Sequence, residues 1–148
     1  MILSRVTLAR SFLAASSLVL LAADGADSSI TIELENVRNA RGVLRLCLTR
    51  DPAHFPDCNG DAKAITASVP ASVHDVRLPA VEPGSYALSV MHDENSNRRL
   101  DKVLGIPKEG FGFSRNPSLG FGPPAFADVR FSAGAGDSRQ TVRMRYLL

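Results

Sequence analysis

A run of oxygen-bearing side chains in the middle of the chain has the spacing of a cation-binding loop. The segment D-E-N-S-N-R-R-L-D places carboxylates or amides at Asp93, Asn95, Asn97 and Asp101, with the backbone carbonyl of Arg99 at the seventh position. Ca²⁺ takes roughly six to eight oxygen ligands, and a short loop can supply them at alternate positions. The spacing therefore predicts a Ca²⁺ site made by these five residues. Mg²⁺ is less favoured, because it retains its waters.

The match to a calcium loop is partial, and a ligand-free turn accounts for the same residues. The sixth position, where the sharp turn normally requires Gly, is Arg98, and the twelfth, where a Glu normally closes the shell, is Leu104. Asp and Asn side chains at this spacing also build successive turns by bonding their own backbone. Both interpretations stay open: a Ca²⁺-stabilised loop, and a loop closed by its own hydrogen bonds.

A glycine- and phenylalanine-rich run, G-I-P-K-E-G-F-G-F-S, follows this loop at residues 105–114. Aromatic faces with polar groups beside them bind sugars, peptides and lipids. The run predicts a ligand-binding surface made by Phe111, Phe113 and Ser114, together with His92 just before the acidic loop. In the alternative interpretation the phenylalanine rings fill the core, and the glycines let the backbone pack closely against the sheet.

Catalytic constellations are weak in this chain. The three histidines, His54, His74 and His92, each have a carboxylate nearby in the sequence. A serine hydrolase also needs an exposed nucleophile, and Ser114 lies outside any G-x-S-x-G turn. We therefore predict no catalytic residue, and a hydrolase is the least favoured function.

The first 25 residues have the composition of an export signal. Arg5 and Arg10 precede an apolar stretch at residues 11–23, which has signal-peptide length and is short for a membrane span. We expect cleavage near residue 25, a mature domain at residues 26–148 without a membrane span, and a periplasmic or secreted location. The alternative is an uncleaved membrane anchor.

Export bears on whether the two cysteines are oxidised. In an oxidising compartment, Cys47 and Cys58 are expected to form one disulfide that closes a short loop. The alternative is a pair of buried free thiols.

The charge pattern excludes nucleic-acid binding. The formal net charge is only +2, and basic residues neither form a run nor alternate with aromatic residues.

Apolar residues recur with a period of two, which predicts strands. The expected strands lie at 30–34, 44–48, within 63–69, at 76–78, 81–91, 126–131 and 140–147. The turn-rich link at 36–42 predicts a hairpin between the first two. These elements predict an all-β fold, a single antiparallel β-sandwich of about seven strands, transthyretin-like or immunoglobulin-like, with one long ordered loop at 93–125.

The chain resembles a bacterial exported family catalogued as domain of unknown function 2141. The resemblance rests on three segments, P-G-S-Y-A-L-S-V-M-H-D-E-N-S-N-R-R-L-D at 83–101, G-I-P-K-E-G-F-G-F-S at 105–114 and P-P-A-F-A-D-V-R-F at 123–131. The family loop commonly carries Gly where this chain has Arg98, which weakens the calcium prediction and leaves the fold untouched. The resemblance implies no established activity.

Together these features predict an exported, non-enzymatic β-sandwich that serves as an accessory or interaction protein of the cell envelope. Its candidate cofactor is Ca²⁺, and its candidate partner is an envelope protein or a small ligand. The alternatives are a small-ligand or glycan-binding protein that uses the phenylalanine run and, last, a hydrolase.

Overall fold

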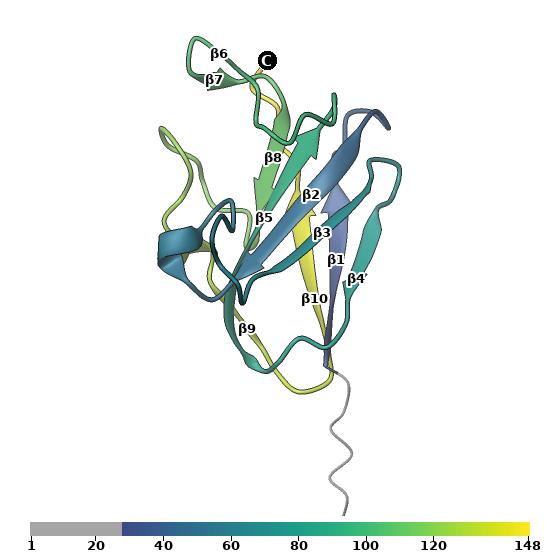
Figure 1. The fold of residues 1–148 in the computed structure, drawn as a ribbon, viewed down its shortest axis with the longest axis vertical. Helices are drawn as coiled ribbons and strands as arrows, with labels where there is room; N and C mark the ends of the chain where they lie inside the picture. Colours follow the sequence, from purple (N-terminus) through teal and green to yellow (C-terminus); the bar gives the residue numbers. More distant parts are fainter. Residues whose placement is uncertain (1–27) are drawn as a thin grey trace, which may run out of the picture.

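The computed structural model describes residues 28–148 as an all-β fold with two facing sheets (Figure 1). The predicted export signal, residues 1–25, lies outside the described residues. The strands are β1 (Ser29–Glu35), β2 (Val43–Thr49), β3 (Ile65–Pro70), β4 (Asp75–Leu78), β5 (Gly84–Asp93), β6 (Lys102–Val103), β7 (Ile106–Pro107), β8 (Gly110–Phe113), β9 (Phe131–Ala133) and β10 (Asp137–Arg143). Two short helical turns, η1 (Pro52–His54) and α1 (Phe126–Val129), join them. The predicted all-β sandwich is confirmed.

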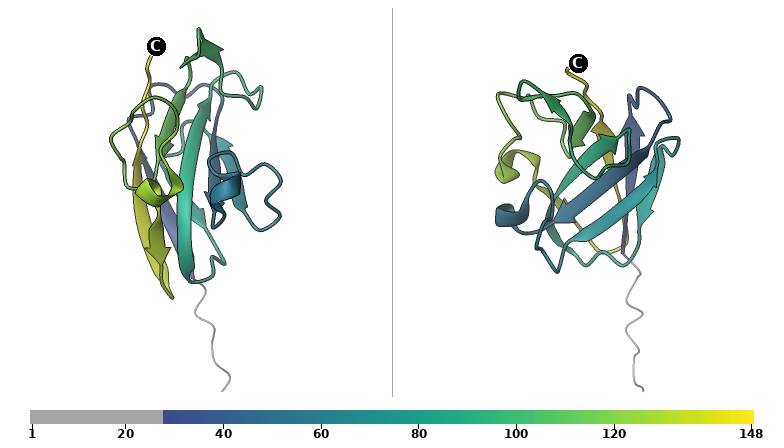
Figure 2. Two further views of the ribbon diagram at one scale, coloured as in Figure 1. Left: turned by 90° about the vertical axis from the view of Figure 1, so that its left-hand side faces the viewer. Right: turned by 45° about the horizontal axis from the view of Figure 1, so that its top comes forward.

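The wide sheet has the order β3-β2-β5-β8, with β9 also pairing with β5, and the narrow sheet has the order β10-β1-β4. The edge-on view in Figure 2 shows the two layers. Within residues 28–148 every strand pairing is antiparallel except that of β1 with β10, which is parallel. Strands β6 and β7 form a separate hairpin at the end of the molecule where the C-terminus lies (Figure 1). No helix in the described part of the chain has the length and apolar character needed to cross a membrane.

The main core lies between the two sheets, because alternate residues of each long strand point inward. In β1 and β2 these residues are fully or almost fully buried: Ile30, Ile32, Leu34, Leu44, Leu46 and Leu48. In β5 and the last strand region they are Tyr86, Leu88, Val90, Val142 and Met144, as the alternation predicts.

The predicted hairpin between the first two strands is wrong. Strand β1 pairs with β4 and β10, whereas β2 pairs with β3 and β5. The link at 36–42 crosses from the narrow sheet to the wide sheet, and Asn36 and Gly42, with φ of 60° and 69°, redirect the chain at its two ends. The apolar stripes of β1 and β2 consequently face each other across the core instead of lying side by side.

The segment 93–125, predicted as one long loop, contains the short strands β6, β7 and β8. In β8 the two glycines face the last strand. A Cβ at Gly112 would lie 2.6 Å from Cγ1 of Val142, and one at Gly110 would collide with the ring of Tyr146. The glycines therefore allow β8 to approach the C-terminal segment closely, and Phe111 and Phe113, which alternate with them, point to the opposite face.

A second, smaller core lies on the outer face of the wide sheet. Phe113, Ala87 and Val129 are buried there, and partly buried side chains, among them Phe55 and Phe126, pack against them. The predicted strand at 126–131 is wrong in its first half, because Phe126–Val129 forms the turn α1 and β9 begins only at Phe131. Residues three apart in a helical turn lie on one side, so Phe126 and Val129 both reach this second core.

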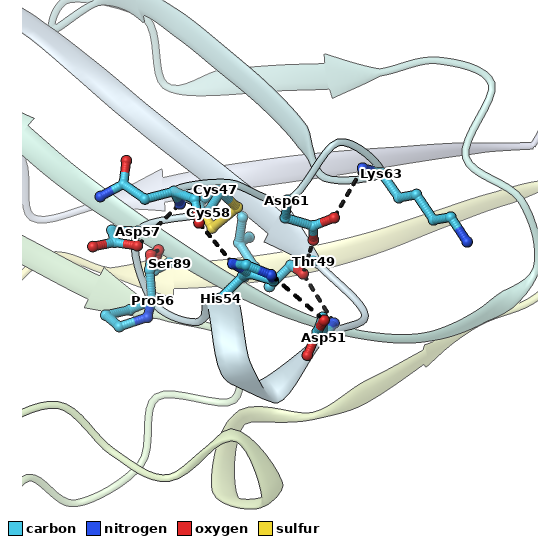
Figure 3. The surroundings of a disulfide bond; sticks show 12 residues. Cys47, Thr49, Asp51, His54, Pro56, Asp57, Cys58, Asp61, Lys63 and Ser89 are labelled. Carbon is cyan, nitrogen blue, oxygen red and sulfur yellow. Dashed lines mark hydrogen bonds and ion pairs between the residues drawn. A yellow bond between two sulfur atoms is a disulfide. The ribbon is translucent and has the colours of Figure 1, made fainter.

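The predicted disulfide is confirmed (Figure 3). Cys47 on β2 is bonded to Cys58, with their Cα atoms 5.7 Å apart. The loop that it closes contains η1, whose start is capped by Asp51 through an acceptor bond from the backbone N–H of Ala53 at 2.9 Å. The disulfide thus holds this loop against the wide sheet, where Phe55 covers the second core.

We predict that Gly112→Ala destabilises the protein by about 1–3 kcal/mol, because the added methyl group meets Val142 and the backbone of Arg143 in a packed space. The measurement is the free energy of unfolding in urea. Gly120→Ala is the matched control: nothing lies within 4 Å of its Cβ position, so we expect a change within about 0.5 kcal/mol. Equal stability of the two variants would show that β8 does not depend on close approach.

Candidate functional site

Most of the candidate polar residues gather at the end of the sandwich where β5 stops. His92 and Asp93 are the last two residues of β5, and both side chains are buried. Successive side chains of a strand point to opposite faces. His92 therefore contacts Tyr146 between the layers, whereas Asp93 contacts Arg45 on the outer face of the wide sheet. These adjacent residues belong to different networks and do not act as a catalytic pair.

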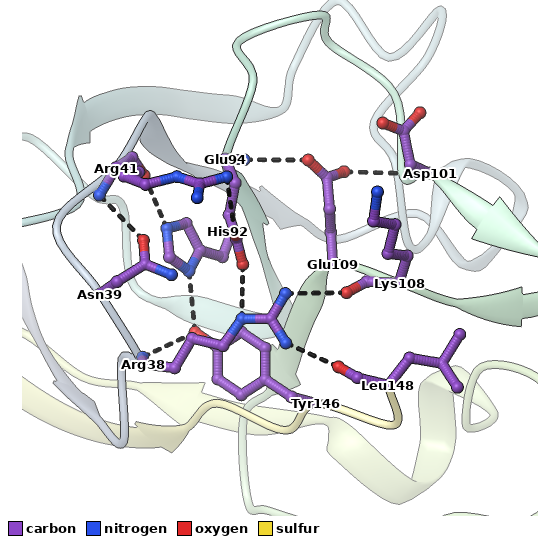
Figure 4. A network of polar contacts seen from close by, with 10 residues as sticks. All are labelled: Arg38, Asn39, Arg41, His92, Glu94, Asp101, Lys108, Glu109, Tyr146 and Leu148. Atoms are coloured by element: carbon purple, nitrogen blue, oxygen red, sulfur yellow. Dashed lines mark hydrogen bonds and ion pairs between the residues drawn. The ribbon is translucent and has the colours of Figure 1, made fainter.

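The ring of His92 is held at both nitrogens (Figure 4). Its Nε2 lies 2.8 Å from the carbonyl oxygen of Arg41, which can only accept, so Nε2 carries a proton. Its Nδ1 lies 2.8 Å from the hydroxyl of Tyr146, and that hydroxyl accepts the backbone N–H of Arg38 at 3.1 Å. The Tyr146 hydroxyl then donates to Nδ1, which completes the hydrogen bonding of both rings.

The guanidinium group of Arg38 connects three separate parts of the chain. Its Nε donates to Glu94 at 2.6 Å, and its two terminal nitrogens donate to the carbonyl oxygens of Leu148 at 2.6 Å and Lys108 at 3.0 Å. The group also lies over the ring of Tyr146, 4.5 Å from its centroid. Arg38 thereby fastens the end of β5, the residue after β7 and the C-terminus together, as Figure 4 shows.

The electrostatics around Arg38 keep Glu94 ionised and Tyr146 protonated. Burial raises the pKa of the Glu94 carboxyl, but hydrogen bonds from Arg38 and Asn39 and the charge of Arg38 outweigh burial, so the pKa lies below its ordinary value. Burial raises the pKa of Tyr146 despite the opposing effect of Arg38. Glu94 therefore stays ionised at neutral pH, and Tyr146 keeps the proton that it donates to His92.

Asp93 organises the outer-face network and the start of the acidic loop. Its Oδ2 accepts from Nε of Arg45 at 2.6 Å and from the backbone N–H of Arg98 at 2.9 Å, and its Oδ1 accepts from the backbone N–H of Asn97 at 3.0 Å. Burial raises the pKa of Asp93, but these hydrogen bonds outweigh burial and hold the pKa below its ordinary value. Arg45 in turn donates to Ser68 on β3 at 3.0 Å.

The exposed part of the loop is closed by bonds between its own residues. The amide groups of Asn95 and Asn97 donate to Asp101 at 2.6 and 3.0 Å. Their amide oxygens accept the backbone N–H groups of Asn97 and Arg99 at 3.1 and 2.9 Å. The bonds from the backbone N–H groups to the amide oxygens form Asx turns. The amide nitrogens of the same two asparagines remain free to donate, and Asp101 accepts from both.

The structure thus brings the predicted metal ligands together, in the arrangement of a ligand-free turn. Both oxygens of Asp93 are occupied by backbone N–H groups, and Asn95 and Asn97 present their nitrogens to Asp101. Arg98 adopts a φ of 67°, the conformation for which calcium loops use Gly. Among residues 28–148, no three His, Cys, Asp or Glu side chains form a group that could hold a metal ion. A Ca²⁺ site that uses amide and carbonyl oxygens stays a prediction.

Glu109 joins the two ends of the acidic loop and is nearly fully buried, with 3% of its surface exposed. One carboxylate oxygen accepts the backbone N–H of Glu94 at 2.9 Å, and the other accepts that of Asp101 at 3.1 Å. The carbonyl oxygen of Asp101 accepts the backbone N–H of Lys108 at 2.8 Å, which closes the base of the β6–β7 hairpin. We refer to Arg38, His92, Glu94, Glu109 and Tyr146 as the polar cluster.

The phenylalanines of the predicted ligand surface pack mainly on each other and on the disulfide loop. The ring of Phe113 lies 5.8 Å from that of Phe55 and 6.0 Å from that of Phe111, and Phe113 is 7% exposed. Phe111 is partly buried in the same core. This packing agrees with the interpretation of the rings as core.

Ser114 is also built into the fold. Its hydroxyl donates to the carbonyl oxygen of Val129 at 2.6 Å and accepts the backbone N–H of Leu88 at 3.1 Å. It bridges β5 to α1 in the buried interior. Its partner on β5, Leu88, lies four residues before His92. Ser114 and the other predicted ligand residue, His92, therefore do not form one site.

Sequence reasoning found only part of the polar cluster. The alternation of the last strand predicts that Tyr146 points inward, and a buried tyrosine hydroxyl needs a partner, so this residue could have been included. Glu109 had a weaker signal, as a single acidic residue within a glycine- and phenylalanine-rich run. For Arg38 and Glu94 we find no local signal, because their partners lie far away in the sequence.

Comparison with known proteins gives one match. A family model described as "Uncharacterized protein conserved in bacteria (DUF2141)" matches residues 32–141. No curated protein and no solved structure shows a significant match to the chain.

We predict that Asp93→Asn lowers the free energy of unfolding at pH 7 by about 1–3 kcal/mol, because Arg45 and the two backbone N–H groups lose the charged acceptor that the buried Asp93 side chain provides. The folded-state pKa of Asp93 is depressed, so its contribution is complete above the ordinary aspartate pKa of about 4 and is lost as the pH falls through the folded-state value. The difference between variant and parent, measured by urea unfolding, should shrink on acidification below pH ~4.

The matched control is Asp128→Asn, an exposed aspartate that forms no ion pair within residues 28–148. It should differ little from the parent at any pH. A constant difference between Asp93→Asn and the parent from pH 7 to pH 3 would contradict the assignment.

Proposed function

The chain belongs to the DUF2141 family of uncharacterized proteins conserved in bacteria, and we propose that it is exported and acts as a non-enzymatic accessory or interaction module of the cell envelope. The proposal rests on the hydrogen bonding of the side chains that could take part in catalysis. The hydroxyl of Ser114 and both ring nitrogens of His92 are used in bonds that hold the fold together. In the described part of the chain, every buried side-chain nitrogen or oxygen has a hydrogen-bond partner.

These bonds support a structural role for the polar cluster. A general base or nucleophile needs a free position toward a substrate. In the polar cluster the donors and acceptors instead face one another, and their bonds join β5, the link at 36–42, Lys108 and the C-terminus. A module of this kind would act through its surface and would use the cluster to keep that surface in place.

Export is supported by two features of the chain. The composition of residues 1–25 is that of an export signal. The disulfide between Cys47 and Cys58 is typical of proteins that mature in an oxidising compartment. Both features fit the periplasm or the cell exterior as the place of action.

The alternative, a small-ligand or glycan-binding protein that uses Phe111 and Phe113, has weaker support. Those rings fill the second core together with Phe55. A surface depression of the molecule lies elsewhere, at Glu35, Asn36 and Arg143. It contains an ion pair of 3.1 Å between Arg143 and Glu35 and has no aromatic lining.

We predict that the full chain, expressed in a bacterium with two membranes, is recovered from the periplasm or the medium. It should be shorter by about 25 residues, as expected for signal peptides of 15–30 residues, and both cysteines should resist alkylation until a reductant is added. The measurement is fractionation followed by mass spectrometry. A chain that starts at residue 26 is the control, and it should stay in the cytoplasm with both thiols reactive.

Two outcomes would contradict this function. Retention of the uncleaved full chain in the cytoplasm would remove the export part. Hydrolysis of an ester, glycoside or peptide substrate by the mature protein, with loss of that activity in His92→Ala while the fold is kept, would remove the non-enzymatic part.

The two interpretations of the acidic loop differ in their response to Ca²⁺: a Ca²⁺ site predicts a Tm that rises when Ca²⁺ is added and falls when it is chelated, whereas a loop closed by its own hydrogen bonds predicts no shift. A bound ion would have to replace the N–H donors on Asp93 and turn both amide groups that face Asp101. A ligand that binds the folded state stabilises it by RT ln(1 + [L]/Kd). A Tm that rises with Ca²⁺ in the parent but not in Asp101→Asn would therefore establish the calcium site instead.

A further inference from the structure

The β6–β7 hairpin carries aliphatic side chains that are exposed to solvent. Leu104 at its apex is 98% exposed, and Val103 and Ile106 on either side are 49% and 44% exposed. The C-terminal residues Leu147 and Leu148 are also more than half exposed. Because Arg38 binds the carbonyl oxygens of both Leu148 and Lys108, the C-terminus lies beside the hairpin, as Figures 1 and 2 show.

The turn at the apex has an unfavourable residue for its geometry. Leu104 and Gly105, the two residues between the strands, have φ of 50° and 82°. Two-residue turns with positive φ at both positions favour Asn, Asp or Gly at the first, since a larger side chain is strained there. A leucine that is both strained and exposed contributes neither to the turn nor to the core. Such local conflicts are expected where a residue serves function.

Four basic side chains lie on the hairpin and in the loop that precedes it. Lys102 is the first residue of β6 and Lys108 follows β7, and they are two of the three lysines of the chain. Arg98 and Arg99 lie in the loop that Asn95, Asn97 and Asp101 hold closed beside the start of β6. All four basic side chains are exposed, and none forms an ion pair with another described residue. Residues 95–109 contain these four basic side chains and two carboxylates, Asp101 and Glu109, so the hairpin and the loop before it have a net positive charge.

The base of the hairpin is held by the polar cluster. Glu109 binds the backbone at Glu94 and Asp101, and the backbone of Lys108 returns to Asp101. The tip is therefore presented on a fixed support, away from both cores.

We propose that this tip docks the protein on an anionic phospholipid surface, with Val103, Leu104 and Ile106 entering the interface and the four basic side chains contacting lipid phosphates. An apolar tip on a positively charged hairpin and loop is complementary to such a surface, because acyl chains accept the aliphatic groups and anionic headgroups attract the cations. A stable protein partner is less favoured, because a specific interface generally needs about 1,000 Å² of buried surface, and a two-residue turn with short strands offers far less. The proposal rests on the proposed function, since it names the surface on which the exported module acts.

The test is co-sedimentation with vesicles, using residues 26–148, which contain every described strand and both cores. The vesicles contain either equal parts of phosphatidylglycerol and phosphatidylcholine or phosphatidylcholine alone. We expect binding to the anionic vesicles that weakens as salt is added. We expect Leu104→Asn to weaken it about tenfold or more while Tm stays the same or rises, because Asn suits the turn.

The charge arm uses Lys102→Glu with Lys108→Glu, which should also weaken anionic-vesicle binding by about tenfold or more. Lys63→Glu, a change of the remaining lysine on the disulfide side of the molecule, is the matched control and should bind like the parent. The Tm of each variant shows that it is folded.

Three results would overturn the proposal: no vesicle binding, equal binding by Leu104→Asn and the parent, or equal binding to neutral and anionic vesicles. Concentration-dependent self-association that disappears in Leu104→Asn, without vesicle binding, would make the tip an interface between copies of this chain. Vesicle binding by a chain that is retained in the cytoplasm would keep the lipid site and reject the proposed function. Export without vesicle binding would do the reverse.

Discussion

Burying a polar side chain is unfavourable unless a group in the protein replaces the water that it loses, and this constraint shapes the end of the molecule where β5 stops. His92, Asp93 and Glu109 are all buried there. Each is satisfied by groups from other parts of the chain, including Tyr146, Arg45 and the backbone at both ends of the acidic loop. Removing one partner would leave a buried polar group unpaired, so these contacts stabilise one another.

The same contacts explain how an otherwise ordinary sandwich supports a projecting arm. The hairpin has only two short strands and no core of its own, and isolated two-stranded hairpins are marginal in water. Its position depends on Glu109 at its base and on Arg38, which also holds the C-terminus. The rigid part of the fold and its exposed tip are thus connected through hydrogen bonds rather than through apolar packing.

The strands could be predicted from the sequence where alternate residues are clearly apolar, as in β1, β2 and β5. The pairing of those strands could not be predicted. Two strands with apolar stripes can pair side by side in one sheet or face each other across the core from two sheets, and the sequence of the link at 36–42 is compatible with both arrangements. The role of Gly110 and Gly112 also depends on distant residues. Tyr146 and Val142, more than 25 positions later in the chain, occupy the space where a side chain at these glycines would lie. Local patterns such as the Asx turns around Asn95 and Asn97 could be recognised, since both partners lie within a few residues.

The parallel pairing of β1 with β10 joins the first and last strands of the described chain, and contacts such as that between Asn36 and Met144 span 108 residues. Contacts of such long range form late, because the intervening chain must lose conformational freedom before these contacts contribute any stabilisation. Until the last strand arrives, β1 can pair only with the short strand β4. A nascent polypeptide therefore cannot complete its narrow sheet until Asp137–Arg143 has been synthesised, after every other described strand is already available to pair.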